Sequence, residues 1–185
     1  MKYVIVDLEA TCWDKPTDRS RMEIIEIGAV ALESATGEAV KEFSEFVRPV
    51  LEPMLSDFCK QLTSIKQSQV DNAESFPAVF ARFVDWIGQE PFRLCSWGGY
   101  DLNQLKADCK QHQIALPQSF ERHINLKKEF SRLMHVKLCG MAGALRIMKI
   151  PLEGTHHRGI DDARNIAKLA QVILARLEKE AGKAV

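Results

Sequence analysis

Apolar residues in the first fifty positions form three runs that are typical of β-strands. The first run, Tyr3–Val6, consists of large and β-branched residues and suits a strand buried on both faces, as in the middle of a parallel sheet. A second apolar run covers residues 22–32, and residues 39–47 alternate between apolar and polar side chains. A polar loop at 14–20 and a turn at Thr36–Gly37 separate these runs. We therefore predict three sequential strands that pair as antiparallel neighbours.

From residue 55 onwards, apolar residues recur mostly at the three- and four-residue intervals of helices. Two short segments, residues 92–97 and 124–126, are instead typical of strands. The helical segments are expected at 55–62, 64–70, 76–87, 102–112, 126–134, 140–148 and 161–180, and the last has the clearest apolar stripe. This order predicts an α/β fold in which helices cover a mixed sheet.

Composition and charge are those of an ordinary soluble globular protein. The chain has 185 residues, 46% hydrophobic and 27% charged, which suffices for one domain with a sizeable core. We expect that domain to span residues 1–180, with a frayed tail at 181–185. The 25 basic and 25 acidic residues cancel, which argues against an indiscriminate, strongly basic nucleic-acid binder but allows a local basic patch.

The five cysteines contain no CxxC pair, so neither a zinc site nor a disulfide framework is expected. A reducing, cytoplasmic location fits this cysteine usage. The first residues lack a signal-peptide pattern, and no apolar stretch is long enough to span a membrane.

Two acids interrupt the first apolar run. Asp7 and Glu9 are two residues apart, so they point to the same side of a strand, where they repel each other and lose hydration. A divalent cation with oxygen ligands would make this arrangement favourable. The alternative is an exposed strand end with two solvated acids, but Leu8 and Ala10 continue the apolar alternation on the other face. Glu26 is a further acid within an apolar strand, and we expect it to pair with a backbone or basic group.

Two more acids lie at the starts of predicted helices. Asp101 follows the 92–97 strand, where the simplest role of a lone aspartate is to stabilise a helix N-terminus. In the last helix, Asp162 lies four residues before Ile166 and therefore continues the buried stripe. Asp161 lies about 100° around the helix and is expected to be a cap or a solvated residue. Asp162 is thus the acid that we expect to face the sheet.

Two histidines precede that acid. His157 is close enough in sequence to reach the Asp162 carboxylate, whereas the adjacent His156 is expected to be a loop residue. The histidine pair could ligate a metal, but no cysteine or third histidine is near in sequence. The residues proposed to converge on one site are Asp7, Glu9, Asp101, Asp162 and His157.

Three segments carry these residues: Asp-Leu-Glu-Ala-Thr-Cys-Trp at 7–13, Ser-Trp-Gly-Gly-Tyr-Asp at 96–101 and His-Arg-Gly-Ile-Asp-Asp-Ala at 157–163. They resemble the three motifs of the DEDDh 3′→5′ exonucleases, and most closely those of the Eri-type exoribonuclease branch. Residues 62–71 resemble the LTGIxQxxVD segment of that branch, with Ser64 in place of the usual glycine. The resemblance extends from Lys2 to about Leu177 and implies a ribonuclease-H-like three-layer fold with a mixed five-stranded sheet.

The resemblance implies hydrolysis assisted by two metal ions. Asp7 would bridge both ions, Glu9 and Asp162 would complete one site, and Asp101 would bind the other ion mainly through water. Such carboxylate ligands suit Mg²⁺, with Mn²⁺ as a substitute. His157 would be the general base, since an imidazole with a reference pKa of about 6.5 is suited to this role near neutral pH. The implied reaction releases nucleoside 5′-monophosphates from the 3′ end of RNA, either single-stranded or in a 3′ overhang.

The positions expected to contact the substrate are Ala10, Thr11, Cys12, Trp13, Met22, Ile25, Trp97 and Arg158. By resemblance, residues 10–13 would touch the terminal nucleotide, and Trp13 would either stack on a base or be a partly buried aromatic. Met22 and Ile25 would wedge against the terminal base. Trp97 fits the core better than a contact, and Arg158 would bind a phosphate unless it is a surface arginine.

Alternative functions remain open at this point. A DEDDh enzyme that acts on DNA in proofreading or repair has the same acids, although residues 10–13 favour RNA. A small-molecule phosphohydrolase could use the same two-metal site. In a different class, a non-catalytic nucleic-acid-binding adaptor on this fold would predict loss of an acid or of the histidine, and none is missing. The sequence leaves both a monomer and a homodimer open.

Overall fold

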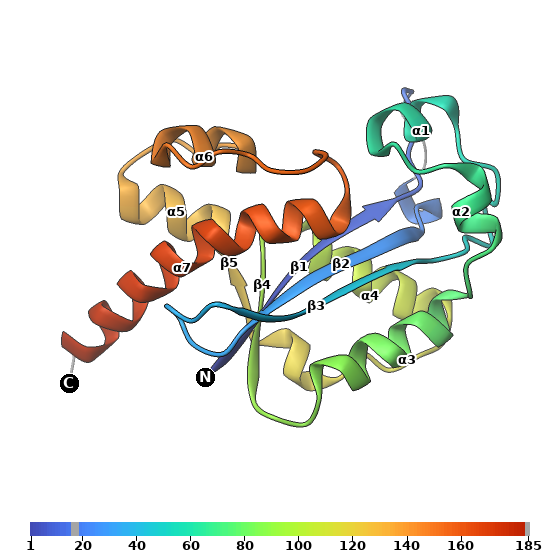
Figure 1. Cartoon of the computed structure of the whole chain (residues 1–185). Helices are drawn as coiled ribbons and strands as arrows, with labels where there is room; N and C mark the ends of the chain where they lie inside the picture. The colour runs from blue at the N-terminus through green and yellow to red at the C-terminus, as the bar shows by residue number, and fades with distance from the viewer. Residues whose placement is uncertain (16–18, 184–185) are drawn as a thin grey trace.

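The computed structural model describes residues 1–15 and 19–183 and has a five-stranded sheet as its middle layer (Figure 1). The strands are β1 (Lys2–Ala10), β2 (Ile24–Leu32), β3 (Ala39–Phe46), β4 (Phe92–Ser96) and β5 (His123–Asn125). Their order in the sheet is β3-β2-β1-β4-β5. β2 pairs antiparallel with both β1 and β3, whereas β4 pairs parallel with both β1 and β5. The predicted mixed five-stranded sheet is therefore confirmed.

Each predicted helix is present; two have the predicted ends, 76–87 and 126–134, and the others are shifted by one to three residues at an end. The helices are α1 (Asp57–Thr63), α2 (Gln67–Asp71), α3 (Phe76–Ile87), α4 (Tyr100–Gln111), α5 (Leu126–Met134), α6 (Met141–Met148) and α7 (Gly159–Lys183). α7 ends three residues later than predicted, so residues 181–183 of the expected frayed tail are helical. Residues 184–185 of that tail, and residues 16–18 of the predicted 14–20 loop, lie outside the described residues. Within the described chain, no helix combines the length and apolar character that crossing a membrane requires.

The alternation of β1 side chains divides the core between the two faces of the sheet. Ile5 points to the face covered by α5, α6 and α7, whereas Val6 packs with residues of α3 and α4 on the opposite face (Figure 1). Asp7 and Glu9 follow Ile5 at two-residue intervals, so they point to the α7 side. They are directed towards the helix whose first turn contains Asp162.

The chain departs from the LTGIxQxxVD pattern at the C-terminal end of α1, where the backbone conformation explains why glycine is usual. Ser64 has φ 60° and ψ 11°, which is the left-handed region that favours glycine. A non-glycine residue costs roughly 1–2 kcal/mol in this conformation. The side chain of the preceding residue stabilises the turn, because Oγ1 of Thr63 accepts a hydrogen bond from the N–H of Ile65 at 3.2 Å.

Candidate active site

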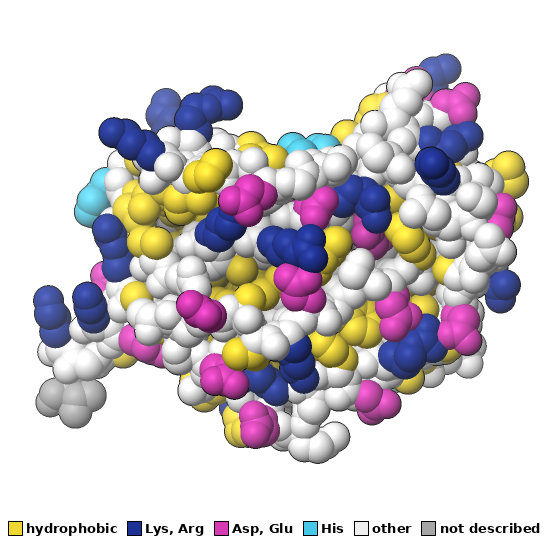
Figure 2. Space-filling model, viewed as in Figure 1, with side chains coloured by type: hydrophobic (Ala, Val, Ile, Leu, Met, Phe, Trp, Pro, Cys, Tyr) yellow, Lys and Arg dark blue, Asp and Glu magenta, His cyan; other side chains and the backbone are white. Residues whose placement is uncertain are grey.

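A cleft of about 910 Å³ opens at the carboxyl ends of β1 and β4. It is lined by all five residues that the sequence predicted to converge, namely Asp7, Glu9, Asp101, His157 and Asp162. β1 supplies two of them, the first turn of α4 one, and α7 with its preceding loop the other two. In Figure 2, histidine side chains lie at the upper edge of the molecule, between the raised regions formed by α6 and α1.

Three of the acids form a compact oxygen cluster. Asp7, Glu9 and Asp162 each offer a carboxylate oxygen, and these oxygens all lie within 4.8 Å of one another. The side chains of Glu9 and Asp162 are almost inaccessible to solvent, with residue exposures of 8% and 4%. As expected from helical geometry, Asp162 faces the sheet, whereas Asp161 accepts hydrogen bonds from the Thr155 N–H and the Arg164 guanidinium.

Burial and mutual repulsion raise the pKa values of the clustered carboxyl groups. The pKa of Asp7 lies well above its ordinary value because of burial, with further contributions from Asp101 and Glu9. Burial, with Glu26 and Asp162 adding to it, raises the pKa of Glu9 to about 8. A bound divalent cation would relieve this repulsion, and an all-oxygen donor set suits hard ions such as Mg²⁺ or Mn²⁺. The residues present therefore fit the metal that the resemblance implies.

A hydrogen bond to the end of β1 positions Asp101 in the site. β1 continues beyond the last residue that pairs with β4, and the N–H of Leu8 donates to Oδ1 of Asp101 at 3.1 Å. Burial raises the pKa of Asp101 to about 6, although hydrogen bonds from Ser96 and from Leu8 oppose the increase. Asp101 thus lies in the first turn of α4, where the sequence predicted an acid that stabilises the helix N-terminus, and it also lines the cleft.

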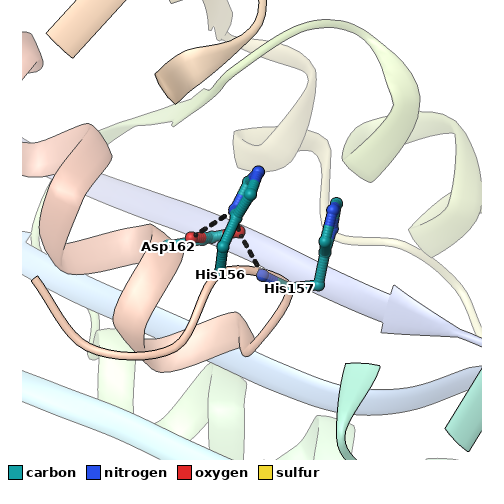
Figure 3. A group of neighbouring side chains, drawn as sticks. All are labelled: His156, His157 and Asp162. Atoms are coloured by element: carbon teal, nitrogen blue, oxygen red, sulfur yellow. Dashed lines mark hydrogen bonds and ion pairs between the residues drawn. The ribbon is translucent and has the colours of Figure 1, made fainter. Parts of the chain in front are cut away.

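The two histidines contact Asp162 in different ways (Figure 3). Nδ1 of His156 lies 2.8 Å and 3.0 Å from the two carboxylate oxygens of Asp162. His157 contacts the same carboxylate through its backbone N–H, which donates to Oδ2 at 2.9 Å. The two imidazole rings are stacked, with centroids 4.0 Å apart and planes inclined by 19°. His156 is a loop residue, as expected, but its ring also contacts Asp162, which the sequence did not predict.

The conformation of the loop explains why His157 contacts Asp162 through its backbone and not through its ring. His157 has φ 64°, and this left-handed residue directs its N–H, rather than its ring, towards Asp162. Among the described residues, none forms a hydrogen bond to the His157 ring, which lines the cleft. Burial and the neighbouring His156 lower the pKa of His157, while Asp162 acts in the opposite direction. The His157 ring is thus available to a molecule in the cleft.

Buried Glu26 and partly buried Arg158 form an ion pair at the start of α7. Nε and Nη2 of Arg158 each lie 3.1 Å from a carboxylate oxygen of Glu26, and the Gly159 N–H donates to the same carboxylate at 3.0 Å. The guanidinium also lies over the Phe46 ring. The expectation that Glu26 pairs with a basic group and the backbone is confirmed. Arg158 does not line the cleft, so the structure does not place it where the predicted phosphate contact would require.

The remaining predicted substrate contacts divide into two groups. Five of them line the cleft: Ala10, Cys12, Trp13, Met22 and Trp97. Thr11 instead accepts a hydrogen bond from the Glu23 N–H at 3.0 Å and ties β1 to the chain before β2. Ile25 is fully buried in the cluster that contains Leu55 and Cys59, so the prediction that it wedges against a base is wrong.

Trp97 is both packed in the core and exposed to the cleft, which are the two alternatives that the sequence left open. Its ring packs against Phe130, and its indole N–H donates to the Cys139 carbonyl at 3.1 Å, while the residue also lines the cleft. Residues that the sequence did not identify line the cleft as well: Leu62, Tyr100, Gly140, Met141 and Ala142. Leu62 and Tyr100 lie within the motif segments 62–71 and 96–101, whereas Gly140, Met141 and Ala142 lie in no motif and reach the cleft through the packing of α6.

Two glycines allow the helix that contains Asp162 to lie directly on the sheet. A Cβ on Gly28 of β2 would come within 2.0 Å of the Gly159 carbonyl carbon. A Cβ on Gly159 would lie 3.0 Å from the Asp7 carbonyl oxygen. This close approach of the two backbones brings the first turn of α7 to the end of β1, and with it Asp162 to Asp7.

A mixed five-stranded sheet with clustered acids at the end of its central strand defines a ribonuclease-H-like nuclease fold. The comparison with known families agrees: a family model described as "Exonuclease" matches residues 4–170. This chain therefore belongs to the exonuclease family.

The relatives that match the chain include exoribonucleases. ERI1 exoribonuclease 2 of Mus musculus is 35% identical over 189 residues, which cover 90% of this chain and 28% of that protein. The 3′-5′ exoribonuclease 1 of Homo sapiens is 32% identical over 175 residues, which cover 90% of this chain and 50% of that protein. The chain thus spans about a quarter to a half of the length of these two relatives.

Among solved structures, the chain is similar to the nuclease domain of 3′hExo, a DEDDh family member, bound to rAMP. That comparison has a TM-score of 0.88 and 32% sequence identity, and it covers 95% of this chain and 92% of the other. The ribonuclease-H-like fold implied by the motif resemblance is therefore confirmed over nearly the whole chain.

Proposed function

We propose that this domain is a metal-dependent 3′→5′ exonuclease that removes nucleoside 5′-monophosphates from the 3′ end of RNA, single-stranded or in a 3′ overhang. The observation that carries the proposal is the cluster of Asp7, Glu9 and Asp162 oxygens within 4.8 Å of one another in an open cleft. The exoribonuclease relatives support the reaction class. The similar nuclease domain bound to rAMP supports a cleft suited to a nucleoside monophosphate.

Two Mg²⁺ ions, or Mn²⁺ in their place, would be held by these carboxylates together with that of Asp101. When bound, such cations neutralise charge on the scissile phosphate and stabilise the leaving oxygen. The His157 ring accepts the proton of the attacking water at a ring nitrogen. The lowered pKa of His157 keeps that ring neutral, and therefore able to accept a proton, near pH 7. Asp162 orients the residue through its hydrogen bond to the His157 N–H.

Apolar and aromatic side chains supply a binding surface for the terminal nucleoside. Trp13, Trp97, Tyr100 and Leu62 line the same cleft as the acids. A nucleobase gains affinity by stacking on aromatic side chains without a requirement for one particular base. We propose that these residues hold the terminal base while the acids hold the phosphate, which favours an enzyme that degrades a strand of any sequence from its end.

A digestion assay tests the proposed function. RNA and DNA of one sequence, each labelled at the 5′ end, are incubated with the protein in Mg²⁺, in Mn²⁺ and in EDTA. We expect a ladder of progressively 3′-shortened RNA with either metal, slower shortening of DNA, and no shortening in EDTA. A single internal cut would contradict exonuclease action. Shortening of DNA alone would transfer the proposal to the DNA-directed alternative, and binding without cleavage in every metal would favour the adaptor.

The contact between Gly28 and Gly159 gives a test of the site's assembly. Gly28→Ala places a methyl group where only 2.0 Å is available to the Gly159 carbonyl carbon, so α7 must move away from β1. We expect at least about a hundredfold loss of hydrolysis, since a displacement of about 1 Å at a catalytic site can have that effect. We also expect a lower Tm, because overpacking costs roughly 1–3 kcal/mol. Circular dichroism melting and the ladder assay measure the two effects.

Gly182→Ala is the matched control for that variant, because a Cβ at this position near the end of α7 meets nothing within 4 Å. Its activity and Tm should be those of the unchanged protein or slightly better. Full activity of Gly28→Ala would show that the close approach of α7 to β2 does not position Asp162.

A further inference from the structure

The segment from Leu126 to Ile150 is strongly basic in a chain whose net charge is zero. It contains six Lys and Arg residues, at positions 127, 128, 132, 137, 146 and 149, and one acid, Glu129. Glu129 pairs with Arg132, which also pairs with Glu180. Among the described residues, no acid forms an ion pair with Arg146 or Lys149, and both side chains are exposed. These two cations therefore have no internal partner that accounts for them.

Both cations belong to α6 or its C-terminal cap, and α6 borders the cleft. Ala142 of α6 lines the cleft, and Arg146 follows it by four residues, so these two share one face of the helix. Lys149 is the C-cap residue that directly follows α6. Arg146 lies roughly 6 Å from Ala142 along the helix axis, given a rise of 1.5 Å per residue, and Lys149 lies just beyond the end of the helix. In Figure 2, basic side chains stand above the raised region at the upper left, over α6, next to the edge where the histidines lie.

We propose that Arg146 and Lys149 bind successive phosphates of a single strand where it leaves the cleft on the 5′ side of the terminal nucleotide. The inference rests on the proposed function, because the cleft must hold the 3′-terminal nucleotide for the strand to continue over α6. A polynucleotide presents one negative charge per nucleotide, and both cations can bind it without regard to sequence. Arginine adds a planar fork of donors that matches phosphate oxygens.

The test separates binding along the strand from chemistry in the cleft. In the Arg146→Gln/Lys149→Gln variant, we expect the Kd for a fluorescent 12-nucleotide RNA, measured by anisotropy in Ca²⁺, to be about tenfold weaker. The slope of log Kd against log salt should fall by about 1.4, since each lost phosphate contact of a single strand contributes roughly 0.7. Hydrolysis of a p-nitrophenyl ester of a nucleoside 5′-monophosphate, which occupies only the cleft, should stay within about twofold of wild type.

Two further variants serve as controls. Lys110→Gln/Arg122→Gln removes the same charge from the far end of α4 and from the opposite end of the sheet, and its Kd should equal that of wild type. Arg146→Lys/Lys149→Arg keeps both charges and should restore the salt slope.

An unchanged Kd and slope in the double glutamine variant would overturn the proposal, as would equal weakening in the control. Loss of hydrolysis of the small ester would also overturn it, because the effect would then arise in the cleft. If wild type hydrolyses neither substrate, the proposed function fails, while the binding measurements still test this surface.

Discussion

Replacing Asp7 with asparagine is expected to lower Mg²⁺-dependent hydrolysis by at least about 10³-fold. Asp7 lies in the oxygen cluster with Glu9 and Asp162, and Asp101 is the charged neighbour that influences it most. Loss of its charge would remove a ligand of the bound cations. Charge stabilisation by such cations is worth several kcal/mol, and each 1.4 kcal/mol corresponds to about a factor of ten in rate. Ladder assays at increasing Mg²⁺ concentrations measure the change.

The same variant has an expected effect on stability in the opposite direction. In EDTA, Asp7→Asn should melt a few degrees higher than wild type, because one of the buried, mutually repelling carboxylates has been removed. For a chain of this size, about 1 kcal/mol corresponds to roughly 2–4 °C. Addition of Mn²⁺ should raise the Tm of wild type but not that of the variant. Calorimetry in EDTA and in Mn²⁺ therefore tests the cluster without using catalysis.

Asp161→Asn is the matched control for this experiment. Asp161 is adjacent to Asp162, but its carboxylate accepts hydrogen bonds from Thr155 and Arg164 outside the cluster. Its activity should remain within about twofold of wild type. A fully active Asp7→Asn enzyme at saturating Mg²⁺, or one that melts lower than wild type in EDTA, would contradict the assignment of Asp7 as the central ligand.

Replacing His157 with alanine is expected to lower turnover by about 10²–10⁴-fold, which is the usual contribution of a general base. Binding of RNA in Ca²⁺ should change by less than about threefold, because the contact between residue 157 and Asp162 uses the backbone N–H, which alanine retains. Single-turnover rates and anisotropy measure the two quantities separately. A variant as active as wild type would exclude His157 as the base.

His156→Ala distinguishes between the two stacked rings. Its ring holds the Asp162 carboxylate through Nδ1, so we expect it to position Asp162 rather than to accept the proton. Its loss should lower turnover by less than about tenfold. If instead His156→Ala loses a hundredfold or more while His157→Ala remains nearly active, the general base is His156, and the resemblance of residues 157–163 to the third motif has identified the wrong histidine.

Local periodicity made much of the candidate site predictable. Side chains alternate along a strand whatever the rest of the fold is, so Asp7 and Glu9 had to share a face once residues 2–10 formed a strand. The 3.6-residue period of a helix likewise selected Asp162 over Asp161 as the acid that faces the sheet. The resemblance of three segments to the DEDDh motifs then implied the ribonuclease-H-like fold and supported the set of four acids and a histidine.

The sequence by itself thus determined the elements and the faces on which Asp7, Glu9 and Asp162 lie, because each follows from the geometry of a single strand or helix, and the motif resemblance added the family. The tertiary structure decided which partner each side chain meets. Arg158 pairs with Glu26, 132 positions away, instead of facing the cleft. The His156 ring contacts the Asp162 carboxylate because the left-handed conformation of His157 directs the His157 ring elsewhere. Ile25 became buried because the segment around α1 packs over β2. These contacts depend on sheet register and on the close approach of distant backbones, which no local pattern of residues specifies.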